Sequence, residues 1–151
     1  MDSATHNSES LSVIVCRDIV RAAAALRKYA DADLGPAGLS GPQFGILRQL
    51  ELAGAMPLSE LGRRLWVTCG NVTGLVDRLV AAGHVRRTRD DVDRRVVLAE
   101  LTDQGREIVG RLTPVVLDRL TQFTSALTET QLHELQVLLE KICCNAQPEG
   151  K

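Results

Sequence analysis

The order of apolar and polar residues predicts a chain built mainly of helices. In four segments, apolar residues return every three or four positions, at residues 9–33, 42–54, 103–126 and 128–145. This spacing gives a helix one buried face. Glycines and prolines at 34–42 separate the first two segments, and Pro114 is expected to bend the third. Thr102 and Thr128 precede the last two segments as candidate N-caps.

Between the second and third segments, the pattern predicts two short helices that meet at a tight turn. Leu61 and Leu65 are one helical turn apart, and the apolar spacing resumes after the turn at Val72, Leu75, Val76 and Leu79. Residues 66–69 leave room only for a sharp reversal, with Thr68 placed to cap the second helix by accepting a backbone hydrogen bond. Gly83 is expected to end that helix. This pattern predicts a helix-turn-helix.

The second of these helices has a polar outer face that favours contact with DNA. Small or hydrogen-bonding residues let a helix lie close to base edges in the major groove, and they are found here at Thr68, Cys69, Gly70, Asn71, Thr73, Gly74 and Arg78. Asn71 and Thr73 are expected to reach the bases from the first turns of the helix. An alternative role for Asn71 is support of the helix start.

An arginine-rich β-hairpin is expected directly after the helix-turn-helix. Residues 84–89 and 94–101 contain many β-branched residues, and the stretch 90–93 between them has the composition of a turn. Such a projecting hairpin is called a wing. A narrow minor groove concentrates negative potential and attracts arginines from a wing.

The arginines of this region have two expected roles. Arg95, together with Arg94, is a candidate for the minor groove, with Asp93 holding the guanidinium by a charge-assisted pair. The remaining candidates are long cationic side chains expected to meet phosphates, namely Arg63, Arg64, Arg78, Arg86 and Arg87.

The hairpin also carries a sequence motif. Asp93-Arg94-Arg95, followed by five residues and Leu101-Thr102, resembles the D-x-R-x5-L-T wing signature of the MarR family of bacterial transcription regulators. Gly105 follows, as is usual in that family. Residues 67–85 resemble the family's recognition helix, and the resemblance in length and helix order extends over roughly residues 10–145.

The resemblance implies a single domain over residues 1–151, mostly α-helical with a small β wing. It implies a winged helix-turn-helix module for DNA binding at 42–102 and dimerisation helices at 10–34 and 103–145. It further implies a homodimer that binds a pseudo-palindromic, double-stranded DNA operator, acts as a repressor and is released by a small ligand.

Composition and charge agree with this interpretation. With 44% hydrophobic but only 3% aromatic residues, the core of this 151-residue chain must consist mostly of leucine, valine and alanine. The net charge of −1 conceals an uneven distribution, because residues 63–95 hold eight arginines against four aspartates, a net of +4, so that the remainder carries −5. The positive charge therefore lies on the proposed DNA-binding module, and DNA affinity is expected to depend strongly on salt.

Other classes of protein find little support. No apolar run is long enough to span a membrane, and the polar start does not resemble a signal peptide, so a cytoplasmic protein is expected. No enzyme activity, metal or cofactor is expected, because no zinc pattern or catalytic pairing is formed by Cys16, Cys69, Cys143, Cys144, His6, His84 and His133. A winged helix that binds another protein instead of DNA is the main alternative.

Two alternatives for the effector stay open. The resemblance implies a small, often aromatic or phenolic anion in a crevice between the dimer helices and the winged module, with candidate contacts from Arg17, Arg21, Phe44 and Arg106. The other alternative is oxidation of Cys16, because one branch of the family senses organic hydroperoxides through a cysteine near this place, helped by tyrosines. Tyr29 is the only tyrosine here, and a cysteine on an apolar stripe is also explained as part of the core.

Overall fold

The computed structural model describes residues 9–65, 67–91 and 93–145, and these form a mostly helical chain with a small antiparallel sheet. The predicted fold class is therefore confirmed. In chain order the elements are α1 (Leu11–Leu34), the 3₁₀ turn η1 (Gly35–Ala37), α2 (Gly41–Ala53), β1 (Met56–Pro57), α3 (Leu58–Leu65), α4 (Cys69–Ala81), β2 (Val85–Arg89), β3 (Val97–Leu101), α5 (Asp103–Phe123) and α6 (Glu129–Asn145).

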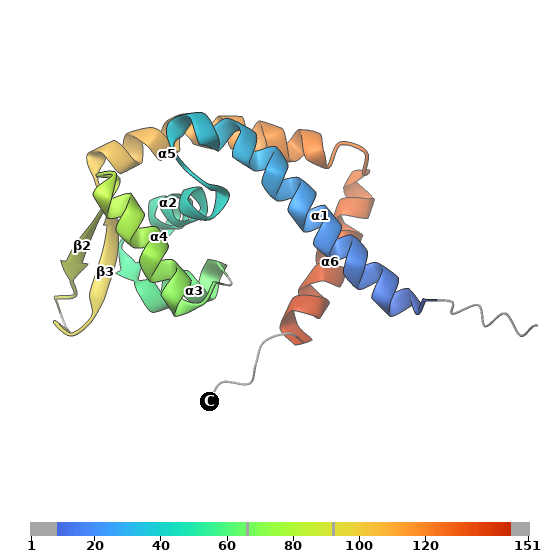
Figure 1. The fold of residues 1–151 in the computed structure, drawn as a ribbon, viewed down its shortest axis with the longest axis horizontal. Coiled ribbons are helices and arrows are strands. Elements are labelled where there is room, and N and C mark those ends of the chain that lie inside the picture. Colours follow the sequence, from blue (N-terminus) through green and yellow to red (C-terminus); the bar gives the residue numbers. More distant parts are fainter. Residues whose placement is uncertain (1–8, 66, 92, 146–151) are drawn as a thin grey trace, which may run out of the picture.

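A winged module is built from α2, α3, α4 and the sheet (Figure 1). The strands are ordered β1-β3-β2, and the β2–β3 hairpin projects from the module beside α4. Aliphatic side chains fill the module's core, as the low aromatic content requires. The fully buried ones include Ile46, Leu47, Leu61, Val72, Val76 and Leu79.

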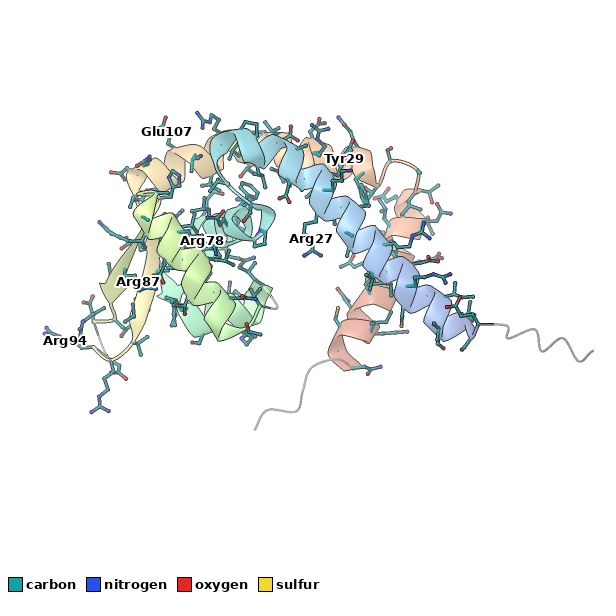
Figure 2. The ribbon with its side chains drawn as sticks, viewed as in Figure 1. Arg27, Tyr29, Arg78, Arg87, Arg94 and Glu107 are labelled. Carbon is teal, nitrogen blue, oxygen red and sulfur yellow. The ribbon has the colours of Figure 1, made fainter. Side chains whose placement is uncertain are left out.

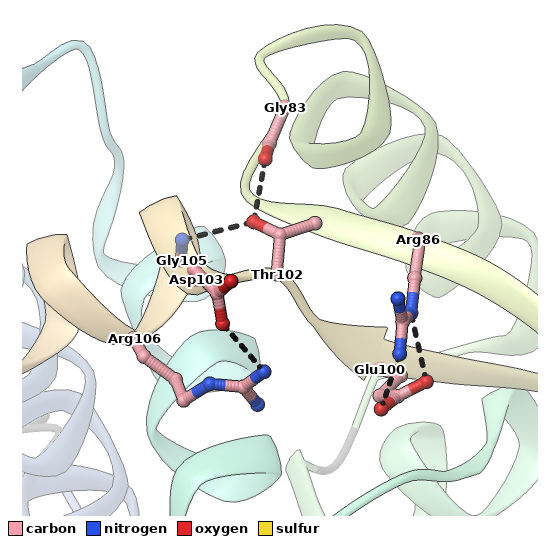
Figure 3. Close-up of polar contacts among 7 residues, drawn as sticks. All are labelled: Gly83, Arg86, Glu100, Thr102, Asp103, Gly105 and Arg106. Carbon is pink, nitrogen blue, oxygen red and sulfur yellow. Dashed lines mark hydrogen bonds and ion pairs between the residues drawn. The ribbon is translucent and has the colours of Figure 1, made fainter.

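The side chain of Thr102 ties the end of α4 to the start of α5 (Figure 3). Gly83 has a φ of 78°, in the left-handed region, and the amide of the next residue, His84, donates to the carbonyl of Leu79 (2.9 Å). The Thr102 hydroxyl accepts from the amide of Gly105 (3.0 Å) and donates to the carbonyl of Gly83 (2.6 Å), so the predicted N-cap of α5 is confirmed. A Cβ on Gly105 would lie 2.0 Å from the His84 carbonyl oxygen, so only glycine fits this close approach.

The hairpin turn is longer than the sequence pattern predicts. β3 begins at Val97 and not at Arg94. The physical reason is that the turn uses its own backbone groups: the amide of Val96 donates to the carbonyl of Asp93 (2.9 Å), and the amide of Asp90 donates to the carbonyl of Val96 (3.1 Å). These residues are therefore unavailable to a longer ladder with β2.

One helix boundary also differs from the prediction. α5 ends at Phe123, a little earlier than expected, because the hydroxyl of Thr124 donates to carbonyls of the last helical turn. Between α2 and α3, the short strand β1 ends at Pro57, and Leu58 is the first residue of α3. The predicted turn positions Trp66 and Val92 lie outside the described residues.

A charged and aromatic cluster joins α1 to α5. Arg119 donates two hydrogen bonds to Asp33 (2.6 and 2.8 Å), and its guanidinium lies 4.9 Å from the centre of the Tyr29 ring. The hydrogen bond from Arg119 lowers the pKa of the Asp33 carboxyl, which keeps the pair charged in mild acid. Tyr29 also packs against Phe123, with 5.6 Å between ring centres. The tyrosine therefore serves the packing of these two helices.

The outer helices expose a large apolar surface. α6 lies apart from the winged module (Figure 1), and none of its described residues is buried. Exposed apolar side chains occur on α1, α5 and α6, and include Val13, Val20, Leu117, Leu135, Leu138 and Ile142. Several exposed apolar side chains on the same helices are typical of an interaction face. Within the described parts of the chain, no helix is long and apolar enough to cross a membrane.

Candidate nucleic-acid interface

Burial of one side of α4 determines which residues face outward. Val72, Val76 and Leu79 have no exposed surface and pack α4 onto the module. The opposite side carries the predicted DNA-contacting residues, of which Gly74 is half-buried and the others with described side chains are exposed, namely Thr68, Gly70, Asn71, Thr73 and Arg78. Cys69 is the first residue of α4, and its side chain lies outside the described part of the structure.

Thr68 occupies the predicted N-cap position, but the predicted side-chain bond is absent. Its backbone is extended (φ −63°, ψ 151°), and its carbonyl accepts from the amide of Val72 (3.0 Å). No described amide of α4 donates to its hydroxyl. Because the side chain is exposed, water is an equivalent partner, so the cap bond would add little stability.

Two glycines leave the outer face of α4 open. Among the described residues, a Cβ at Gly70 or Gly74 would meet no atom within 4 Å other than the adjacent residues and the backbone of the helix itself. Gly62 of α3 is different, because a Cβ there would lie 3.0 Å from the carbonyl oxygen of Val67 in the turn between the two helices. The turn therefore requires Gly62, whereas the fold does not require Gly70 or Gly74. Their lack of side chains leaves room for a partner close to the helix backbone.

Two wing arginines are engaged by carboxylates. Arg86 donates two hydrogen bonds to Glu100 across the hairpin, each 2.9 Å long, and this lowers the pKa of Glu100 (Figure 3). Arg87 forms an ion pair with Asp77 of α4, with 2.7 Å between Nη2 and Oδ1. Sequence reasoning found neither pair, because both depend on the hairpin register and on how α4 packs.

The wing tip presents arginines that no carboxylate holds. Arg94 and Arg95 are exposed, and their guanidinium groups make no ion pair within the described chain; Figure 2 shows Arg94 projecting at the tip. The predicted pair between Asp93 and the Arg95 guanidinium is wrong. Asp93 instead accepts a hydrogen bond from the backbone amide of Arg95 (3.0 Å), because an aspartate in a turn readily bonds the amide two residues later. Asp93 therefore shapes the turn that displays the two arginines.

The other predicted phosphate-binding arginines differ in their surroundings. Arg63 and Arg64 of α3 both donate to Glu60, and the hydrogen bonds from Arg63 and then Arg64 lower the pKa of this carboxyl to about 2. The Glu60 carboxylate thus balances part of the positive charge on α3. Arg78 of α4 is exposed and makes no ion pair within the described residues.

A cavity of about 450 Å³ lies between α1, α2 and α5. Its lining is mainly apolar but contains two arginines, and it includes Leu26, Arg27, Phe44, Arg48, Leu65 and Val116. Arg27 projects from α1 on the side of the cavity (Figure 2). Leu65 is the last residue of α3, so the cavity reaches the helix-turn-helix directly.

Of the four predicted effector contacts, only Phe44 lines this cavity. Arg17 and Arg21 lie on earlier turns of α1 and pair with neighbouring carboxylates on the surface, and Arg106 pairs with Asp103 in the first turn of α5 (Figure 3). Sequence reasoning missed Arg27 and Arg48, because helical spacing alone does not show which turns of α1 and α2 face each other.

The described cysteines are all exposed. Cys16 lies on α1, so its interpretation as a core residue is wrong for the single chain. Cys143 and Cys144 lie near the end of α6. Among the described residues, no cluster of three or more metal-ligating side chains occurs.

An open polar helix beside an arginine-tipped hairpin defines a class, the winged helix-turn-helix proteins that bind double-stranded DNA. The sequence profile of the MarR family matches residues 39–97. The chain belongs to the MarR family of transcription regulators.

Similar proteins support this assignment over most of the chain. The HTH-type transcriptional regulator YkoM of Bacillus subtilis is 31% identical, over 87% of this chain and 85% of its own. The HTH-type transcriptional repressor Rv2887 of Mycobacterium tuberculosis is 32% identical, over 82% of this chain and 89% of its own. Sco3205, a MarR family regulator from Streptomyces coelicolor solved in complex with DNA, has a TM-score of 0.84 and 28% identity, over 90% of this chain and 88% of that chain. These relatives are regulators and not enzymes.

Proposed function

We propose that this chain is a repressor that binds a pseudo-palindromic operator as a homodimer and is released by a small amphipathic anion. The observation that carries the proposal is the open face of α4 next to a wing tip where Arg94 and Arg95 make no ion pair with any described residue. The DNA complex of Sco3205 and the repressor name of Rv2887 support the same function.

A second copy of the chain is the occupant that best fits the exposed apolar helices. Each chain has one α4 and one wing, whereas a palindromic operator offers two equivalent half-sites. A two-fold axis through a pairing of α1, α5 and α6 would bury the apolar residues of α6 and present two recognition helices on one side. Two such helices multiply the specificity of one.

Within each half-site, the outward residues of α4 have separate roles. Asn71 and Thr73 are short polar side chains on the open face, suited to base edges in the major groove. Arg78, further along the helix, is suited to a phosphate. Arg94 and Arg95 extend from the wing toward the adjacent minor groove.

A Gly74→Ala substitution should strengthen the fold and weaken operator binding. Alanine should raise the free energy of unfolding by about 1 kcal/mol, because a glycine inside a helix is costly and the added methyl would meet no described atom outside the local helix backbone and the adjacent residues. The same methyl should lower operator affinity about tenfold, the magnitude of one lost base contact. Thermal unfolding and fluorescence anisotropy with labelled DNA measure the two effects.

Gly110→Ala is the matched control for this prediction. Gly110 is an exposed glycine within α5, and a Cβ there also meets nothing within 4 Å. This variant should gain similar stability and keep wild-type affinity for DNA. Equal DNA affinities of both glycine variants and the wild type would show that α4 does not approach DNA closely at Gly74.

The cavity between α1, α2 and α5 is the proposed effector site. Its apolar walls suit a ring, and the guanidinium of Arg27, which makes no ion pair within the described residues, suits a carboxylate or phenolate. Arg48 is already paired with Glu51. A ligand against Leu65 would act on the helix-turn-helix, and about 3 kcal/mol of coupling would weaken DNA binding roughly 150-fold.

Arg27→Ala should weaken binding of such a ligand at least about tenfold, because a charge-assisted hydrogen bond is lost. A thermal-shift screen of hydroxybenzoates against the wild type would identify a ligand, and DNA competition would measure release. Arg21→Ala is the control, since Arg21 lies outside the cavity. A ligand that binds and releases DNA equally well in all three proteins would place the effector site elsewhere.

A further inference from the structure

One acidic residue lies on the face of α4 proposed to meet DNA. Asp77 is the only acidic residue of α4, and it follows Thr73 by one helical turn on the same side. Its side chain is exposed to 55%. A carboxylate near phosphates is unfavourable because like charges repel, so a cation must balance it when DNA is bound.

Arg87 supplies that cation from the wing. It follows Val85 by two residues in β2, so both side chains lie on the same face of the hairpin, and Val85 is buried toward the module. The side chain of Arg87 therefore extends toward α4 and forms an ion pair with Asp77, with 2.7 Å between Nη2 and Oδ1. The connection from Gly83 to His84 joins α4 and β2 through the backbone. The ion pair adds a tie between the two elements through side chains.

The Arg86–Glu100 pair provides an internal comparison. It lies on the other face of the hairpin, and both partners belong to the wing (Figure 3). It balances charge within the wing but does not connect the wing to α4. Variants of the two ion pairs can therefore distinguish a local effect of charge from an effect on the position of the wing relative to α4.

We propose that Asp77 is a positioning residue for operator recognition, and that it acts through Arg87. The carboxylate keeps Arg87 from contacting phosphates of arbitrary DNA. It also holds the wing at one position relative to α4, so that Arg95 of the wing and Asn71 of α4 meet the same half-site. This inference rests on the proposed operator binding and explains how specificity is divided between the two elements.

The test compares Asp77→Asn with Glu100→Gln on two DNA probes. One probe is a duplex enriched by the wild-type protein from a random pool, and the other is a shuffled duplex of the same composition. Asp77→Asn should bind the shuffled duplex about three- to tenfold more tightly, with a salt slope steeper by about one per protomer, because Arg87 gains a phosphate. It should bind the enriched duplex about tenfold less tightly, because the wing is no longer held in place.

Glu100→Gln should instead strengthen binding to both duplexes by a similar factor. Asp77→Glu should restore much of the wild-type preference, because it can rebuild the pair with Arg87. Arg87→Gln breaks the same ion pair from the wing side without releasing a cation. The preference for the enriched over the shuffled duplex should therefore fall, and the shuffled duplex should bind no more tightly than it binds the wild type. Partly exposed ion pairs contribute little to stability, and thermal unfolding would verify that each variant folds.

Equal changes in affinity for Asp77→Asn and Glu100→Gln on both duplexes would overturn the inference. Asp77 would then act only through its negative charge and not through the position of the wing. An unchanged preference in Arg87→Gln would also overturn it, whether or not the Asp77 variants fold. Failure of the wild-type protein to enrich any motif from the random pool would contradict the proposed function instead. The two failures are therefore distinguishable.

Discussion

Leu138→Glu on α6 should convert the protein into monomers and lower operator affinity at least about 100-fold. Leu138 is 56% exposed in the single chain, on a helix without a buried residue, so the substitution removes no packing within that chain. In the proposed dimer it would place two carboxylates in an apolar interface, where an unpaired charge is costly. Monomers would bind the two half-sites separately and would lose the affinity that is gained by linking two DNA-binding modules. Sedimentation velocity and anisotropy measure the two effects.

Gln136→Glu is the matched control, since it adds the same charge to α6 at a polar position. It should remain dimeric and bind DNA like the wild type. The winged module of Leu138→Glu should stay folded, because none of the described residues in the buried core belongs to α6; circular dichroism would verify this. A Leu138→Glu protein that stays dimeric at micromolar concentration would show that α6 does not form the interface.

Arg95→Ala should weaken operator binding by about 1–3 kcal/mol, roughly five- to 150-fold, while the dimer stays intact. The guanidinium of Arg95 is exposed at the wing tip and makes no ion pair in the described chain, so its removal costs the free protein little. Its proposed partner is a narrow minor groove, and the loss should therefore be largest when the base pairs under the wing are A·T. Anisotropy with duplexes that differ only at those positions measures this dependence.

Arg111→Ala serves as the control for this prediction. Arg111 is exposed on α5 and makes no ion pair within the described residues, but it lies outside the winged module. Its loss should leave operator affinity unchanged. An Arg95→Ala protein that loses affinity equally for all duplexes would indicate a phosphate contact, and unchanged affinity would remove Arg95 from the interface.

The elements of the DNA-binding module could be predicted from the sequence because each is encoded locally. A stripe of apolar residues determines the buried face of α4, and the opposite face follows from the 3.6-residue period, without knowledge of what α4 packs against. The turn at Gly83 and the cap at Thr102 are likewise formed by neighbouring residues, and both are present. The exposed positions of Asn71 and Arg78 follow from the same rule.

The ion pairs of the candidate DNA interface and the walls of the effector cavity could not be predicted, because the residues that form them are distant in sequence. Arg86 meets Glu100 only in the register that pairs Val85 with Leu101. A hairpin turn two residues shorter or longer would change this register and pair other side chains across the two strands. The effector cavity depends on which turns of α1 and α2 approach each other, and this brought Arg27 beside Phe44 and left Arg21 outside.

By itself, the sequence determined the order and type of the elements, the exposed face of α4 and the family, since these depend on periodicity, caps and a local motif. Only the tertiary structure decided which arginines are available to a partner. Charge on a side chain is a property of the residue, but whether a carboxylate lies within 3 Å depends on how strands and helices pack. For this reason Arg87 is tied to Asp77, whereas Arg94 and Arg95 extend unpaired from the described wing tip.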